Sequence, residues 1–246
     1  SVALDDGGFL LGGHTNSDKS GDVSEESKGG YDLWILRIDA DGNKIWDKSY
    51  GGNGEAIADL IPAPDGNYLL GSRSLSSTQA NSWVRKINPN GGLIWEKRLN
   101  SIGYLGLSSL APTPDGGFLM SGSSATVDDN VTAASKGSND FWAAKLDANG
   151  TILWDKRIGG SSFDTLQGMH TDPHGGGYLL AGTTQSEDGN VSQTTRGNTD
   201  FWIVKIDENG NTEDTRAVAG EILRPGSVEA MLSGELVRPA SIQETD

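Results

Sequence analysis

Acidic and amide side chains are concentrated in three long segments rich in glycine and serine, residues 14–31, 123–139 and 183–199. In each segment an Asp or Asn precedes a valine, and nine residues after that valine comes an Asp that lies two residues before a tryptophan. Carboxylate and amide oxygens in loops suit calcium, which takes about six to eight oxygen ligands. The pattern therefore predicts calcium ligands at Asp22, Asp32, Asp128, Asn130, Asp140, Asp188, Asn190 and Asp200.

The same residue types have a second use that needs no metal. Asp and Asn accept hydrogen bonds from nearby backbone N–H groups and so hold turns and loops in place. On this interpretation the Asp before each tryptophan keeps its own loop folded. Both interpretations stay open at the level of the sequence.

Aromatic residues form a periodic set and an irregular set. The seven tryptophans recur at regular positions, which indicates packing between repeated units. Tyr31, Tyr104 and Phe163 fall outside this pattern, and we expect them on the rim that carries the long loops. They are the predicted ligand-binding residues of a rim site for a protein or a sugar.

The sequence lacks the usual signatures of an enzyme. It contains no cysteine, which excludes thiolate catalysis and thiolate metal ligation. The three histidines, His14, His170 and His174, have no metal-ligand spacing, and neither a Gly-x-Ser-x-Gly elbow nor a phosphate-binding loop occurs. We therefore expect a non-catalytic protein. A carboxylate pair for glycoside hydrolysis stays open, because acidic residues are plentiful and such a pair forms in three dimensions.

The formal net charge of −15 argues against two classes of partner. A surface this acidic repels the phosphates of nucleic acids and of anionic membranes. No stretch of the sequence is long and apolar enough for a transmembrane helix, so we expect no direct insertion into a membrane.

Two motifs recur in step along the chain. One runs from Trp34 to Lys48 and returns from Trp83, from Trp142 and, with less similarity, from Trp202. The other begins as Asp-Gly-Gly-Phe-Leu-Leu and recurs about every 50 to 60 residues, a period typical of propellers and solenoids. Its aromatic residues are Phe9, Tyr68, Phe118 and Tyr178.

Each repeat contains four short strand-like runs separated by turn residues, which predicts an all-β propeller of four-stranded antiparallel blades. The predicted propeller spans residues 1–218, and residues 219–246 are predicted to form a degenerate extra strand or a linker. Four repeats fit a four-bladed ring, an arc of a larger ring, or a dimer that completes one ring. The predicted blades are about 1–52, 53–100, 101–160 and 161–218.

The turn between the third and fourth runs is specified by its residues. Its first copy is Asp39-Ala-Asp-Gly42, and the second contains Pro89, whose φ near −65° is incompatible with a type I′ turn. A type I turn followed by a glycine in the left-handed region accommodates all copies.

That turn predicts a register for the hairpin. It places Trp46 opposite Leu36, so that Trp34, Leu36 and Trp46 share one face. Arg37 and Asp47 then lie on the other face, within reach of a cross-strand ion pair that recurs in the next two repeats.

The repeat resembles a family of bacterial secreted and cell-surface β-propeller repeats, and the resemblance covers roughly residues 1–210. The shared motifs are Asp-Gly-Gly-aromatic-aliphatic, a loop rich in Gly, Ser and Asp, Asp-aromatic-Trp-x-x-Lys-aliphatic-Asp-x-Asn-Gly, and a Trp-x-Lys-x-aliphatic-Gly-Gly end. Asn81 replaces the Asp in the second repeat, and Asp214 replaces the last tryptophan. The resemblance implies a bacterial protein that is secreted or held at the cell surface, such as cargo of the type IX secretion route.

Together these observations predict an exported module for adhesion, ligand binding or surface assembly. A glycan-binding or glycan-processing propeller is one alternative, and a structural spacer in a large surface protein is another. The expected partner is a protein or a glycan on a cell surface, with a homodimer or further blades completing the ring.

Overall fold

The computed structural model describes residues 1–51, 54–74, 81–99, 105–125, 131–173, 176–192 and 197–218. In these ranges the chain forms four antiparallel four-stranded sheets and no helix, which confirms the predicted all-β fold with four blades. No helix of the described ranges is therefore long and apolar enough to cross a membrane. The predictions for Tyr104, Asp128, Asn130 and residues 219–246 fall outside the described residues.

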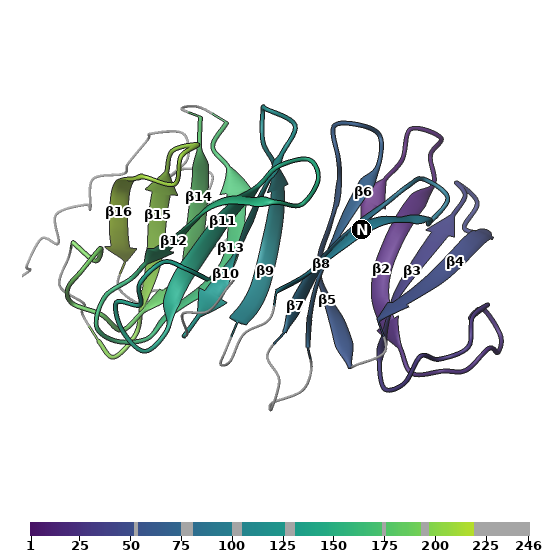
Figure 1. The fold of residues 1–246 in the computed structure, drawn as a ribbon, viewed down its shortest axis with the longest axis horizontal. Coiled ribbons are helices and arrows are strands. Elements are labelled where there is room, and N and C mark those ends of the chain that lie inside the picture. Colours follow the sequence, from purple (N-terminus) through teal and green to yellow (C-terminus); the bar gives the residue numbers. More distant parts are fainter. Residues whose placement is uncertain are drawn as a thin grey trace, which may run out of the picture.

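Within every sheet the strands are paired in chain order, so each sheet is one repeat (Figure 1). The first strand of the first sheet is much shorter than its counterparts in the other three sheets. The strands are β1 Val2–Ala3, β2 Phe9–Thr15, β3 Asp32–Ile38, β4 Lys44–Gly51, β5 Glu55–Pro62, β6 Tyr68–Ser74, β7 Ser82–Ile87, β8 Leu93–Leu99, β9 Leu105–Pro112, β10 Phe118–Ser124, β11 Asp140–Leu146, β12 Ile152–Ile158, β13 Asp164–Thr171, β14 Tyr178–Thr184, β15 Asp200–Ile206 and β16 Thr212–Val218.

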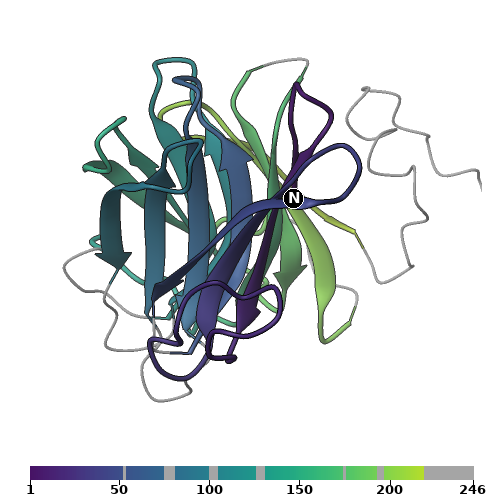
Figure 2. The same cartoon turned by 90° about the vertical axis from the view of Figure 1, so that its right-hand side faces the viewer.

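The four sheets form an arc in which each sheet packs on the next. Strand β5 packs against β2 and β9, and β9 packs against β13, so the inner strands lie side by side along the arc. Figure 1 shows the first sheet and the fourth at opposite ends of the long axis, and in Figure 2 the first sheet lies in front. Among the described strands, no pair from the first and fourth sheets makes more than marginal contact.

Three hydrophobic clusters fill the three junctions between sheets. Leu10, Leu33 and Ile35 of the first sheet pack toward the second sheet, and the clusters at the second and third junctions contain Trp142 and Trp202. These side chains are fully buried. The apolar core is therefore divided into layers between sheets.

The predicted turn is confirmed in all four sheets. In the first copy the N–H of Gly42 donates to the carbonyl oxygen of Asp39 at 3.1 Å, and Asp39 Oδ1 accepts from the N–H of Asn43 at 2.8 Å. Glycine takes a positive φ at each fourth position of the turn, a conformation in which a side chain is strained. The four values are 85° at Gly42, 76° at Gly91, 83° at Gly150 and 76° at Gly210.

The predicted register of this hairpin is wrong. Trp46 pairs with Arg37, not with Leu36, because the pairing shifts by one residue directly after the turn. The extra residue is Ile45, whose side chain is 54% exposed. A one-residue insertion in a strand turns every later side chain to the other face, so Trp46 does not share a face with Trp34.

Because of this one-residue shift in pairing, the tryptophan of the fourth strand in each of the first three sheets points toward the next sheet. A Cβ on the turn glycine Gly91 would lie 2.9 Å from the ring of Trp46, and Gly150 and Gly210 face Trp95 and Trp154 in the same way. We call this repeated packing the tryptophan–glycine contact. The equivalent glycine of the first sheet, Gly42, has no atom within 4 Å of that position among the described residues.

The predicted ion pair between Arg37 and Asp47 is also wrong, for the same reason. Arg37 pairs with Asp6 of the β1–β2 turn, while Asp47 binds Lys44 at 3.1 Å. In the first three sheets the aspartate of the Asp-Gly-Gly motif thus binds the cation of the third strand, and in the fourth sheet Asp172, three residues before the motif position, takes its place. The other three pairs are Lys86–Asp65 at 2.6 Å, Lys145–Asp115 at 2.6 Å and Lys205–Asp172 at 2.9 Å.

Two glycine substitutions separate backbone strain from the tryptophan–glycine contact. Gly42→Ala is expected to cost about 1 to 2 kcal/mol, since only the positive φ opposes it. Gly91→Ala is expected to cost about 1 to 3 kcal/mol more, because the new methyl group overlaps the Trp46 ring. Denaturant unfolding measures both free energies, and equal losses would show that the contact contributes nothing.

The Asp115–Lys145 pair predicts a pH dependence. Hydrogen bonds from Lys145 and Thr113 lower the pKa of Asp115 from 3.8 to about 2. A lowered folded-state pKa adds stability above the unfolded-state pKa and loses it as the pH falls. Asp115→Asn should therefore be less stable than the parent by up to about 1 kcal/mol at pH 7, and the difference should shrink as the pH falls from about 4 and vanish only below about pH 2. Unfolding curves across this range test it, and a difference that grows toward low pH would contradict it.

Candidate ligand-binding site

The repeated motif in the long loops docks each loop on its own sheet. In the first sheet Asp47 Oδ2 accepts from the N–H of Ser24 at 2.8 Å and from the indole N–H of Trp34 at 3.0 Å. Burial works to raise the pKa of Asp47, but hydrogen bonds from Ser24, Trp34 and Lys44 outweigh burial and hold the pKa far below 3.8. In the third sheet Asp155 accepts from Thr132, Ala133 and Trp142 in the same way.

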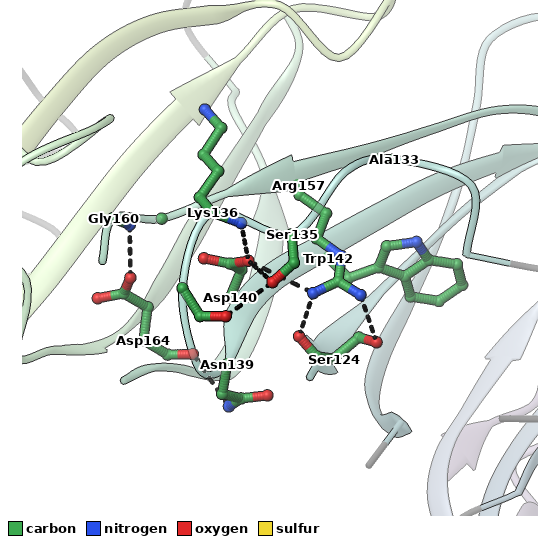
Figure 3. A network of polar contacts seen from close by, with 12 residues as sticks. Ser124, Ala133, Ser135, Lys136, Asn139, Asp140, Trp142, Arg157, Gly160 and Asp164 are labelled. Atoms are coloured by element: carbon green, nitrogen blue, oxygen red, sulfur yellow. Dashed lines mark hydrogen bonds and ion pairs between the residues drawn. The ribbon is translucent and has the colours of Figure 1, made fainter. Parts of the chain in front are cut away.

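A second polar network holds the loops between the third and fourth sheets (Figure 3). Asp140 is fully buried, and its Oδ2 accepts from the N–H of Lys136 at 3.0 Å. The guanidinium of Arg157 lies 3.4 Å from the same oxygen and also donates to both oxygens of Ser124. Asp140 therefore closes its own loop and pairs with a buried cation.

Asp164 lies beside this network at the start of the fourth sheet. Its Oδ2 accepts from the N–H of Gly160 at 2.8 Å and from the hydroxyl of Ser186 at 3.0 Å. Burial, with the nearby Asp140 carboxylate, raises the pKa of Asp164 above 3.8. Gly159 passes between the two acids, since a Cβ there would lie 2.2 Å from Asp140 Oδ1 and 2.7 Å from Asp164 Oδ2.

The junction of the first two sheets has a related arrangement. Asp32 Oδ2 accepts from the N–H of Lys28 at 2.8 Å, as Asp140 does from Lys136. Glu55 takes the place of Asp164, and Arg85 binds both oxygens of Glu55 at 2.6 and 3.0 Å. At this junction the buried Arg85 thus pairs with Glu55, the equivalent of Asp164. At the other junction Arg157 pairs with Asp140, the equivalent of Asp32.

These arrangements bear directly on the calcium prediction. Asp32, Asp140, Asp188 and Asn190 each use a side-chain oxygen to accept from a backbone N–H. Among the described residues no three His, Asp or Glu side chains are grouped so as to hold a metal ion. These four residues thus fit the loop-holding interpretation. Of the other described members of the predicted set, Asp22 is exposed and Asp200 is buried. Calcium binding stays a prediction.

The two described rim aromatics lie at different junctions. Tyr31 is 42% exposed, stacks edge-on against His14 at 5.2 Å, and accepts from the N–H of Glu55 through its carbonyl. Phe163 is 54% exposed and bridges to Asn139 at the junction of the third and fourth sheets. The structure therefore does not bring them together into one site.

A pocket of about 710 Å³ lies between the first and second sheets. It opens at the end of the sheets formed by the hairpin turns, opposite the long loops. Its aromatic lining consists of Trp46 and Tyr68. Its polar lining comes from three turns and one strand and comprises Asp5, Asp6, Asn67, Asn90 and Arg37.

Side-chain directions explain why this junction is open. At the next junction Lys86 crosses to the Ala148 carbonyl at 3.4 Å, over the Phe118 ring, and Trp95 donates to the same carbonyl at 3.3 Å. At the first junction Arg37 turns back to the Ile38 carbonyl and Asp6 in its own sheet. The indole N–H of Trp46 has no hydrogen-bond partner among the described residues.

The sequence did not single out this pocket. Trp46 and Tyr68 belong to the periodic aromatic set and are typical of packing. Arg37 in place of lysine is one sequence signal that sets this junction apart from the corresponding positions of the other repeats.

No family model and no curated protein matches the sequence. Among solved structures, an apocarotenoid oxygenase from Synechocystis aligns with 76% of this chain and 46% of its own, at 15% identity and a TM-score of 0.41. Prolyl oligopeptidase B from Galerina marginata aligns with 78% of this chain and 28% of its own, at 12% identity and a TM-score of 0.36. The chain spans less than half the length of either protein. Likeness of this degree bears on neither activity nor ligand.

The buried Arg157–Asp140 pair is expected to matter more for the free energy of unfolding than a half-exposed ion pair does. Arg157→Met should cost about 3 to 5 kcal/mol, because it leaves the buried Asp140 carboxylate without a cation. Lys48→Met, which breaks the half-exposed pair with Glu25 at 2.9 Å, should cost no more than about 1 kcal/mol. Urea unfolding of both variants checks this. Similar small losses in both would contradict the role given to Arg157.

Proposed function

We propose that this protein is a non-catalytic binding module and that the pocket between the first and second sheets takes a neutral saccharide. The observation that carries the proposal is the composition of the pocket. Two aromatic side chains, Trp46 and Tyr68, lie among amide, carboxylate and guanidinium groups from separate turns. Aromatic side chains beside a small number of placed polar groups are a feature of small-ligand sites.

The chemistry of the lining suits a sugar. The flat ring of Trp46 offers an apolar surface to the C–H face of a pyranose, and its indole N–H is free among the described residues to donate to a hydroxyl. Asn67 and Asn90 each offer a donor and an acceptor for further hydroxyls. The net charge of −15 disfavours an anionic sugar.

The lining also supports binding without covalent catalysis. It contains no serine, threonine, cysteine, histidine or lysine among the described residues, and of its two carboxylates, Asp5 and Asp6, the second is held in an ion pair with Arg37. The resemblance to exported surface repeats supports a location outside the cell, where glycans are abundant. Adhesion is then the use to which such a module is best suited.

A pair of asparagines provides the test. Asn90 and Asn149 occupy the same exposed position of equivalent turns, and only Asn90 lines the pocket. A glycan array of neutral oligosaccharides identifies a ligand, and titration calorimetry then measures its affinity. Loss of one hydrogen bond, about 1 kcal/mol, predicts roughly fivefold weaker binding for Asn90→Ala and no change for Asn149→Ala.

A second comparison tests the aromatic surface. Trp46→Phe and Trp95→Phe make the same change at equivalent positions, and only Trp46 lines the pocket. Weaker binding in Trp46→Phe alone supports the proposal. Absence of binding to any oligosaccharide, or equal losses within either pair of variants, would overturn it.

A further inference from the structure

The two end sheets of the arc each bury only one face. Strands β7 and β10, from the second and third sheets, are buried along both faces. Along β14 and β15 of the fourth sheet, buried and partly exposed residues alternate. We call the side of a sheet turned toward the preceding sheet its leading face, and the side turned toward the following sheet its trailing face.

The first sheet leaves its leading face uncovered. Phe9 is 41% exposed, and Leu11, Trp34, Leu36 and Ile38 are partly exposed. In the other three sheets, the residues equivalent to Trp34, Leu11 and Ile38 are nearly or fully buried under the preceding sheet. These buried equivalents are Trp83, Trp142 and Trp202, then Leu70, Met120 and Leu180, and then Ile87, Leu146 and Ile206.

Among the described residues, nothing covers the opposite face of the fourth sheet. Leu179, Phe201 and Ile203 are partly exposed on its trailing face. Their equivalents in the first and third sheets are fully buried under the following sheet. Those equivalents are Leu10 and Leu119, Leu33 and Phe141, and Ile35 and Ala143.

The leading face of the first sheet and the trailing face of the fourth sheet carry residues equivalent to those that form an aromatic contact between the third and fourth sheets. Phe141, on the trailing face of the third sheet, packs on Trp202 of the fourth with 4.7 Å between ring centroids. The Phe141 ring also lies 2.8 Å from where a Cβ of Gly182 would be. Phe201 is the equivalent of Phe141, while Trp34 and Gly13 are the equivalents of Trp202 and Gly182.

The space next to Gly13, which corresponds to the space that Phe141 fills next to Gly182, is empty among the described residues. A Cβ placed there would meet no atom within 4 Å among the described residues. The first sheet thus presents an open position next to a partly exposed tryptophan, and the fourth sheet presents a partly exposed phenylalanine.

We propose that two copies of this chain associate head to tail, with the trailing face of the fourth sheet of each copy packed on the leading face of the first sheet of the other. Phe201 of one copy then lies over Gly13 and Trp34 of the other, as Phe141 lies over Gly182 and Trp202 within the chain. The pair forms a ring of eight sheets, within the range of about four to eight blades found in propellers.

A second copy fits these faces better than an unrelated partner. The faces are of the two unlike kinds that already pack together at three internal junctions, so no new type of contact is needed. Head-to-tail contacts close into rings when the rotation allows it. Contiguous apolar surface of this kind is rarely left uncovered on a monomer.

The outer edge of the junction between copies differs from the internal ones. Asp214 stands where the other sheets carry the tryptophan, and Gly42 of the first sheet is open. The tryptophan–glycine contact is therefore missing between copies. Asp214→Trp is expected to restore it and to tighten the dimer.

The test is the solution mass of the chain and of two single-face variants. Sedimentation equilibrium over a wide range of concentration should give about twice the 25.9 kDa of one chain. Leu36→Lys blocks the leading face and Ile203→Lys the trailing face, so each variant alone should be a monomer. Mixing the two leaves one intact junction and should restore a dimer, although a weaker one than the parent. Leu153→Lys, at a 55% exposed site on neither end face, should stay dimeric.

Gly13→Leu is a second leading-face variant that does not disturb the fold, because its position is open within the chain. It too should be a monomer, with the melting curve of the parent. A parent chain that is monomeric at all concentrations, a dimer that survives Gly13→Leu, or two folded single-face variants that fail to associate when mixed would each overturn the proposal. A mass that keeps growing with concentration would overturn the closed ring.

Discussion

The packing of Trp46, Trp95 and Trp154 on the turn glycines of the following sheets is the contact on which the rest of the structure depends. A single repeat cannot bury its apolar surface alone, and the stacking of neighbouring repeats builds the core, so each sheet needs its neighbours. The glycine of the turn serves twice, because its positive φ forms the hairpin and its missing side chain leaves room for the indole. One residue type at one position thus couples the fold of each sheet to its place in the arc.

This coupling has a direction, and the direction gives the molecule two unlike ends. In each of the first three sheets, the tryptophan of the fourth strand packs on the turn glycine of the following sheet. At one end, no tryptophan among the described residues packs on Gly42. At the other end, Asp214 stands where the fourth strand of the other sheets has a tryptophan. The same asymmetry reappears in burial, with Trp34 partly exposed on one end sheet and Phe201 on the other. Unlike ends of this kind favour head-to-tail assembly over a face-to-face pair.

The two rims of the sheets have different tasks. At the loop-bearing rim, buried acids such as Asp140 and Asp47 hold the long loops, and their oxygens accept from backbone N–H groups. At the opposite rim, the turn of Arg37 toward its own sheet leaves Trp46 beside an open pocket. The acidic motifs that drew attention in the sequence thus support the scaffold, and the candidate binding surface lies among residues that are typical of packing.

The sequence by itself determined the strands, the all-β class and the turn chemistry, because these depend on residues close in the chain: Pro89 excludes one turn, and Gly42 permits another. The tertiary structure decided the face on which Trp46 lies, since one extra residue, Ile45, reverses the alternation and no local propensity reports it. It also decided which residues pair with Arg37 and Arg85, and it left the first and fourth sheets apart. Alternation along a strand is a local property, whereas the covering of a face depends on the sheet that packs against it.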